Sequence, residues 1–188
     1  PLTSVLKPPA GASFEQLLTG NNNQRIILAS SAGYGFINTL GNLDSTQKAG
    51  KNIINFAADS RLLPVTRIDA PTATDATSED GNDNSAEAAS LTPDHLAVVT
   101  NAGYLLIFEL SDLPEQARGK GNKMITLKAD EEVLAITPLR KQDSLVITAG
   151  KRHVTLKPMD LANYTGKRGS RGGKLPRGFQ NVTSVEVG

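Results

Sequence analysis

The residues best suited to chemistry are lysines and arginines gathered in the second half of the chain. Residues 118–177 hold fourteen basic and five acidic residues, whereas residues 68–117 hold ten acidic residues and no lysine or arginine. The formal charge of the whole chain, +1, conceals this asymmetry. A local excess of nine positive charges attracts polyanions. We interpret the region as a nucleic-acid-binding surface, with a solvated basic face as the plainer alternative.

Glycines alternate with many of these cations, in three similar turns at residues 47–56, 118–127 and 166–175. Glycine lets the backbone approach a sugar-phosphate chain closely and exposes amide donors. The turns at 118–127 and 166–175 contain no aromatic residue, and the first turn has only Phe56 at its end, so contact with a duplex backbone is favoured over base stacking on single strands. The residues predicted to contact DNA are Lys51, Arg118, Lys120, Lys123, Lys151, Arg152, Lys167, Arg168, Arg171, Lys174 and Arg177.

Enzymatic interpretations find little support in the sequence. The chain has no cysteine, which excludes thiolate nucleophiles and zinc-thiolate sites, and only two histidines. We expect His95 to pair with the adjacent Asp94 and His153 to lie on the surface of a strand. The string GSRGGKL (169–175) lacks the first glycine and the final Ser or Thr of a phosphate-binding Walker A loop. We therefore predict no catalytic residues and no metal site, and no apolar run reaches the ~18 residues of a membrane span.

Internal repeats in the sequence predict recurring structural elements, and these elements must position the cations. The string ASSAGYGFINTLGNL (29–43) recurs as VTNAGYLLIFELSDL (99–113), and ITAGKRHVTLKPMDL (147–161) is a third, weaker copy. We place the repeats at about 25–68, 93–140 and 141–187, within one domain spanning 1–188. Residues 69–92 are rich in Asp, Glu, Ala, Ser and Thr, and we interpret them as an acidic low-complexity insertion loop.

Each repeat reads as a strand, a tight turn containing glycine, and a second strand. Alternating hydrophobic residues with glycine at the turn are typical of an antiparallel hairpin. Units of four antiparallel strands that recur every ~45 residues predict propeller-like blades. Three units are too few to close an ordinary ring of 4 to 8 blades. The sequence therefore predicts an all-β fold, a partial and open β-propeller of about three blades.

Several strings identify the chain as similar to a known family. AGYGF (32–36), SDLPEQARGKGNKMI (111–125), AGKRHVTLKP (149–158) and GKRGSRGGKLPRGFQNV (166–182) resemble the C-terminal domain of the A subunit of bacterial topoisomerase IV. The resemblance implies a broken β-propeller, or β-pinwheel, whose blades exchange strands and whose basic outer edge binds DNA. The related gyrase domain carries a Gln-Arg-Arg-Gly-Gly-Lys-Gly box. Here the nearest strings, at 47–51, 117–121 and 169–175, are degenerate, which favours topoisomerase IV.

The resemblance also implies a function. The domain would bind and bend duplex DNA without catalysing a reaction, and present it to the strand-passage core for decatenation and supercoil relaxation. Its partners would be duplex DNA, the remainder of the A subunit, and the separate ATPase subunit in a cytoplasmic, nucleoid-associated heterotetramer. The intact ATP-dependent enzyme would need ATP and Mg, and this part of it no cofactor. The alternative is a protein-interaction module whose basic edge docks an acidic partner.

Overall fold

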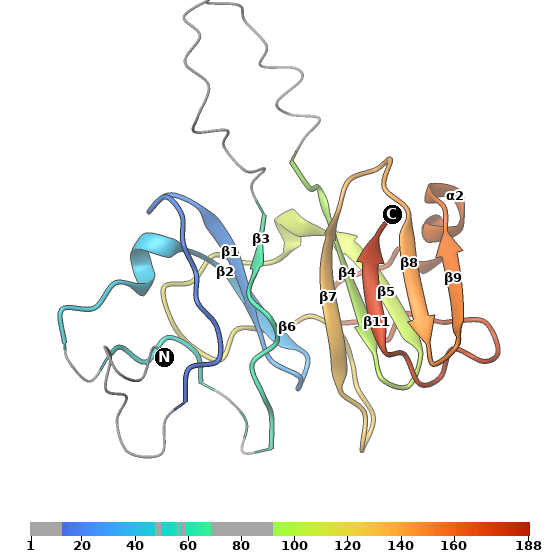
Figure 1. Ribbon diagram of the computed structural model, residues 1–188, viewed down its shortest axis with the longest axis horizontal. Helices are drawn as coiled ribbons and strands as arrows, with labels where there is room; N and C mark the ends of the chain where they lie inside the picture. The colour runs from blue at the N-terminus through green and yellow to red at the C-terminus, as the bar shows by residue number, and fades with distance from the viewer. Residues whose placement is uncertain (1–12, 48–49, 56, 58, 69–91) are drawn as a thin grey trace, which may run out of the picture.

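Three antiparallel sheets stand side by side in the computed structural model, which describes residues 13–47, 50–55, 57, 59–68 and 92–188 (Figure 1). The predicted insertion at 69–92 falls, apart from Thr92, outside the described residues. The strands are β1 (Arg25–Ala29), β2 (Tyr34–Thr39), β3 (Thr66–Arg67), β4 (His95–Thr100), β5 (Tyr104–Glu109), β6 (Asn122–Lys123), β7 (Val133–Leu139), β8 (Leu145–Ala149), β9 (Arg152–Leu156), β10 (Gly173–Lys174) and β11 (Ser184–Val187). One short helix, α2 (Pro158–Leu161), follows β9.

Each sheet is built on one hairpin, and two of the sheets receive a strand from the next repeat. The strand orders are β3-β1-β2-β6, β10-β5-β4-β7 and β11-β8-β9, which we call the first, second and third blades. Strand β6 follows the hairpin of the second blade in sequence but pairs with β2 of the first. In the same way β10 follows the hairpin of the third blade and pairs with β5 of the second. These exchanged strands join the blades in series, and the blades form an open array, as the prediction of a broken propeller requires (Figure 1).

The hairpin turns of the first two blades match each other, and the third differs. Ala29 pairs with Gly35 and Val99 with Leu105, so each of these turns encloses five residues. Gly33 and Gly103 supply the positive φ that the turns need, at 81° and 75°. In the third blade Ala149 pairs with Arg152, which leaves a turn of only two residues. The shorter turn explains why the third copy aligns less well in sequence.

The second blade is buried on both faces, because it packs between the other two blades. Ile27 and Ile37 of the first blade share a core with Val98 and Leu106 of the second. The other face of the second blade, including Val99, packs against the third blade. Double burial explains why β4 and β5 carry nearly continuous hydrophobic residues instead of a strict alternation.

Among the described residues, no helix is long and apolar enough to cross a membrane.

Candidate nucleic-acid interface

The three basic turns, which are far apart in sequence, lie next to one another in the fold. Gly119 of the second turn donates its N–H to the carbonyl of Ile53 in the first (2.9 Å), and Asn55 N–H donates back to Gly119 (3.0 Å). Gly169 of the third turn donates to Met124 of the second (2.8 Å). Successive repeats thus place their glycine-rich turns in one continuous series. This adjacency is what a single track for a polyanion needs.

Two of the candidate lysines lie where the exchanged strands meet the hairpin turns. Lys123 in β6 pairs with Tyr34 at the start of β2, and Lys174 in β10 pairs with Tyr104 at the start of β5. Both lysine side chains are exposed. Arg168 extends from the third turn to the second, where its guanidinium donates to the Lys123 carbonyl (2.7 Å). The exchange of strands therefore gathers Lys123 and Arg168, cations from two repeats, at the turn end of the first hairpin, and brings Lys174 to the turn end of the second.

Cations of the third blade continue this arrangement. Lys151 and Arg152 are exposed at the two-residue turn of the β8–β9 hairpin. The Arg152 guanidinium lies directly against Gly178, which places it beside Arg177 in the chain segment that follows β10. Lys167 is exposed next to the point where Thr165 bridges to Ile107. All four cations remain accessible to solvent.

The two remaining outer candidates share a hollow beside the first blade. Lys51 and Arg118 both line it, together with Asp44, Gln47 and Asn52. The Lys51 ammonium donates to the carbonyl of Asn42 at 2.9 Å, which leaves its other donors available. The structure therefore brings a cation of the first repeat next to one from the second.

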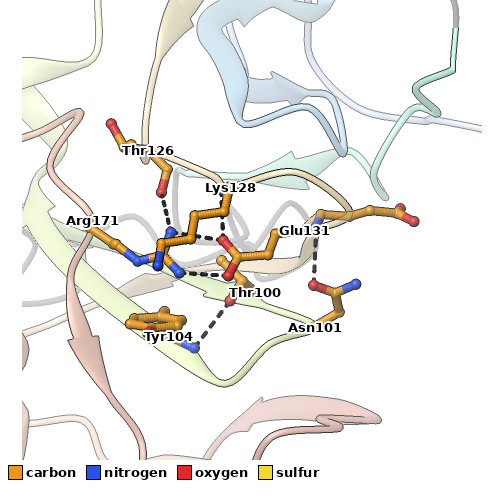
Figure 2. Close-up of polar contacts among 8 residues, drawn as sticks. Thr100, Asn101, Tyr104, Thr126, Lys128, Glu131 and Arg171 are labelled. Carbon is orange, nitrogen blue, oxygen red and sulfur yellow. Dashed lines mark hydrogen bonds and ion pairs between the residues drawn. The ribbon is translucent and has the colours of Figure 1, made fainter.

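Arg171 differs from the other ten candidates, because its charge is already paired. Its guanidinium binds the Glu131 carboxylate through two hydrogen bonds, of 2.8 Å and 2.5 Å (Figure 2). It also lies over the ring of Tyr104, 3.9 Å from the centroid, and donates to the Thr126 carbonyl at 3.4 Å. Within the described residues, it is the only candidate that forms an ion pair with a carboxylate.

The environment of this pair stabilises its charged form. The Arg171 and Glu131 side chains retain 24% and 13% of their accessible surface, so water screens them only partly. Hydrogen bonding from Arg171, together with the Lys128 N–H, lowers the pKa of Glu131 to about 2. Glu131 in turn raises the pKa of Arg171, and contact with Arg171 lowers the pKa of Tyr104. We call this group of Arg171, Glu131 and Tyr104 the second clasp.

The first blade has a related contact without the carboxylate. The Lys120 ammonium lies 4.2 Å from the centroid of the Tyr34 ring. Lys120 stands three residues before Lys123 in β6, just as Arg171 stands three residues before Lys174 in β10. Lys120 is exposed, and no carboxylate pairs with it among the described residues. We call the pair of Lys120 and Tyr34 the first clasp.

Sequence reasoning missed both clasps. Tyr34 and Tyr104 lie outside the basic turns in the sequence, yet each ring lies beneath a cation from the next repeat. Glu131 precedes β7 in a turn that directs its carboxylate toward Arg171, a contact that the sequence pattern does not indicate. The one available signal was the recurrence of AGY, with its tyrosine, at the turns of the first two hairpins (32–34 and 102–104).

The opposite, open ends of the hairpins carry mixed charge. His95 Nδ1 lies 2.7 Å from Asp94 Oδ1, which confirms the expected polar pair. Lys141 lies 3.9 Å from the same carboxyl group. His153 is exposed on β9, as predicted. No group of three or more His, Asp or Glu side chains that could hold a metal occurs within the part of the chain that the structure describes.

The comparisons with known proteins agree with this architecture. The family model for the DNA gyrase C-terminal domain, a beta-propeller, matches residues 24–69 and 94–140. The A subunit of DNA topoisomerase 4 from Pseudomonas aeruginosa is 39% identical over 196 residues, and its counterpart from Escherichia coli K12 is 34% identical over 193. Each match covers 100% of this chain and 23% of the relative.

Comparison with solved structures also finds C-terminal domains of topoisomerase IV and gyrase A subunits. The E. coli ParC C-terminal domain superposes with a TM-score of 0.80 at 34% identity, covering 100% of this chain and 70% of that one. A DNA gyrase A C-terminal domain, at 13% identity and a TM-score of 0.63, shares the fold and covers 88% of this chain and 49% of its own. The chain belongs to the family of β-pinwheel C-terminal domains found in the A subunit of topoisomerase IV. It spans about a quarter of the length of the curated relatives it matches.

Proposed function

We propose that this chain is a non-catalytic domain that binds duplex DNA along the edge formed by its basic turns. The observation that carries the proposal is the hydrogen-bonded series of those turns, which places exposed cations from successive repeats side by side. Apart from Arg171, the candidate cations are not paired with carboxylates within the described residues. Lysine and arginine contacts with phosphates release counterions and so stabilise binding without reading sequence.

The open array of blades supports a second part of this proposal, that the bound duplex is bent. A duplex that contacts cations on three successive blades would have to follow the path on which those cations lie. Bending 20–30 base pairs by 40–90° costs about 1–6 kcal/mol, which contacts to ~5 to 8 phosphates offset. A bent segment presented to a strand-passage core would support decatenation and supercoil relaxation by the intact topoisomerase.

The cellular context of the proposal follows from the family. The domain would act in the cytoplasm, associated with the nucleoid, joined to the remainder of the A subunit, with the separate ATPase subunit completing a heterotetramer. ATP and Mg would be required by the intact enzyme and no cofactor by this domain. The alternative function, docking of an acidic protein, uses the same cations, so competition between duplex DNA and the acidic protein distinguishes the two.

The test compares two triple variants with the same loss of charge. The first variant carries alanine at three cations near the turn ends of the hairpins, Lys123, Lys174 and Arg177. The second variant carries alanine at three cations near the open ends, Arg140, Lys141 and Lys157. Duplex affinity of the unaltered chain should fall with salt with a log–log slope of roughly −5 to −7. The first variant should reduce the magnitude of that slope by about three, and the second should leave it nearly unchanged. Equal slopes for both variants would refute the assigned surface.

A further inference from the structure

The two clasps occupy equivalent positions, and the structure shows what differs between them. Glu132 N–H donates to the Asn101 side chain in the second blade, and Arg61 N–H donates to the Ser31 hydroxyl in the first. These matching contacts align Glu132 with Arg61. The residue before each one, Glu131 in the second blade, is therefore Ser60 in the first.

A second pair of hydrogen bonds supports this alignment. Glu131 N–H donates to the Lys128 carbonyl (3.3 Å), and Ser60 N–H donates to the carbonyl of Ala57 (3.0 Å). The Ser60 hydroxyl also donates a hydrogen bond to the same Ala57 carbonyl (2.8 Å). A short neutral side chain thus stands in the first blade where a carboxylate stands in the second.

The presence or absence of this carboxylate changes what the clasp cation can do. Arg171 has one face against Tyr104 and two of its nitrogens on Glu131, and the carboxylate cancels its charge (Figure 2). A cation already paired with a carboxylate releases no counterions when DNA approaches, so it adds nothing to the salt slope. Lys120 has only the Tyr34 ring beneath it, and its three donors remain available for phosphate oxygens.

We propose that Glu131 withdraws Arg171 from the DNA-binding surface, whereas Ser60 leaves Lys120 free to bind phosphate. Duplex DNA is then held more tightly at the junction of the first and second blades than at the junction of the second and third. This inference rests on the proposed function, because it ranks two positions within the same DNA-binding edge. Arg171 becomes a positioning residue that fixes the exchanged strand β10 on β5.

The experiment exchanges the two residues in the 188-residue chain. Ser60→Glu should pair with Lys120 and reduce the magnitude of the salt slope for a duplex of about 30 base pairs by about one. Glu131→Ser should release Arg171 and increase the magnitude by about one. Ser60→Gln, similar in size but uncharged, should leave the slope unchanged.

A double-mutant cycle separates pairing from general repulsion of DNA by a new carboxylate. In a Lys120→Ala background, Ser60→Glu should produce no further change in slope, since its partner is gone. A further reduction by about one in that background would overturn the proposal, as would an unchanged slope for Ser60→Glu in the unaltered chain.

Thermal unfolding checks that each variant is folded. If Glu131→Ser does not fold, the salt slope of Ser60→Glu alone tests the proposal. If the unaltered chain fails to bind duplex DNA, the proposed function fails with it. If the chain binds DNA but the exchanged residues have no effect on the slope, the proposed function stands and the inference about Glu131 and Ser60 is wrong.

Discussion

At the scale of single residues, Glu131 determines whether a basic side chain serves folding or binding. Its bidentate ion pair with Arg171 joins two positions that are 40 residues apart in the sequence. Charge counting correctly identified the basic region, and the cation positions followed from the repeats. The pairing did not follow, because contacts across an exchanged strand depend on how the blades pack.

The pair also predicts a pH dependence of stability. The pKa of Glu131 in the folded chain, about 2, lies below the ordinary value that it recovers on unfolding. The pair therefore stabilises the fold fully above about pH 5, and its contribution is lost as the pH falls toward 2.

Comparison with Glu131→Gln tests this dependence. At pH 6 the variant should unfold with a free energy lower by about 1–3 kcal/mol. The gap between the two proteins should narrow steadily as the pH is lowered to 3 and below, measured by urea unfolding. A gap that is constant across this range would show that the ionised pair contributes nothing.

At the scale of elements, the exchanged strands β6 and β10 connect the blades, although each contains only two residues. The longer hairpins were predictable from hydrophobic pattern and turn glycines. The exchange was not predictable from pattern, because two residues carry no periodicity, and it entered only through resemblance to a family.

Gly172, just before β10, provides a test of the exchange. Its φ is +77°, and a Cβ there would press into the Leu105 carbonyl of the strand that receives β10. Gly150 is the matched control, since its φ is +61° but nothing lies within 4 Å of its Cβ position. Gly150→Ala should cost about 1–2 kcal/mol from backbone strain alone.

Gly172→Ala should lower the free energy of unfolding by clearly more than Gly150→Ala, because strain and displacement of a neighbouring backbone add. Chemical denaturation of both variants provides the measurement. Equal losses would mean that the close approach of β10 to β5 contributes little to stability.

At the scale of the whole molecule, the open array predicts that bound DNA is curved. A duplex of about 30 base pairs labelled at both ends should show increased energy transfer when the chain binds. The Lys123, Lys174 and Arg177 triple alanine variant should show less transfer at saturating protein. If the bound duplex stays straight, the proposed binding surface still stands but the proposed bending role is wrong.

The most direct test of the binding edge is protection of lysines from acetylation by bound duplex DNA, read by mass spectrometry. The proposed contacts Lys51, Lys120, Lys123, Lys151, Lys167 and Lys174 should become protected, while Lys141 and Lys157 at the open ends of the hairpins keep their reactivity. Protection of Lys141 and Lys157, with the six proposed lysines still reactive, would contradict the account.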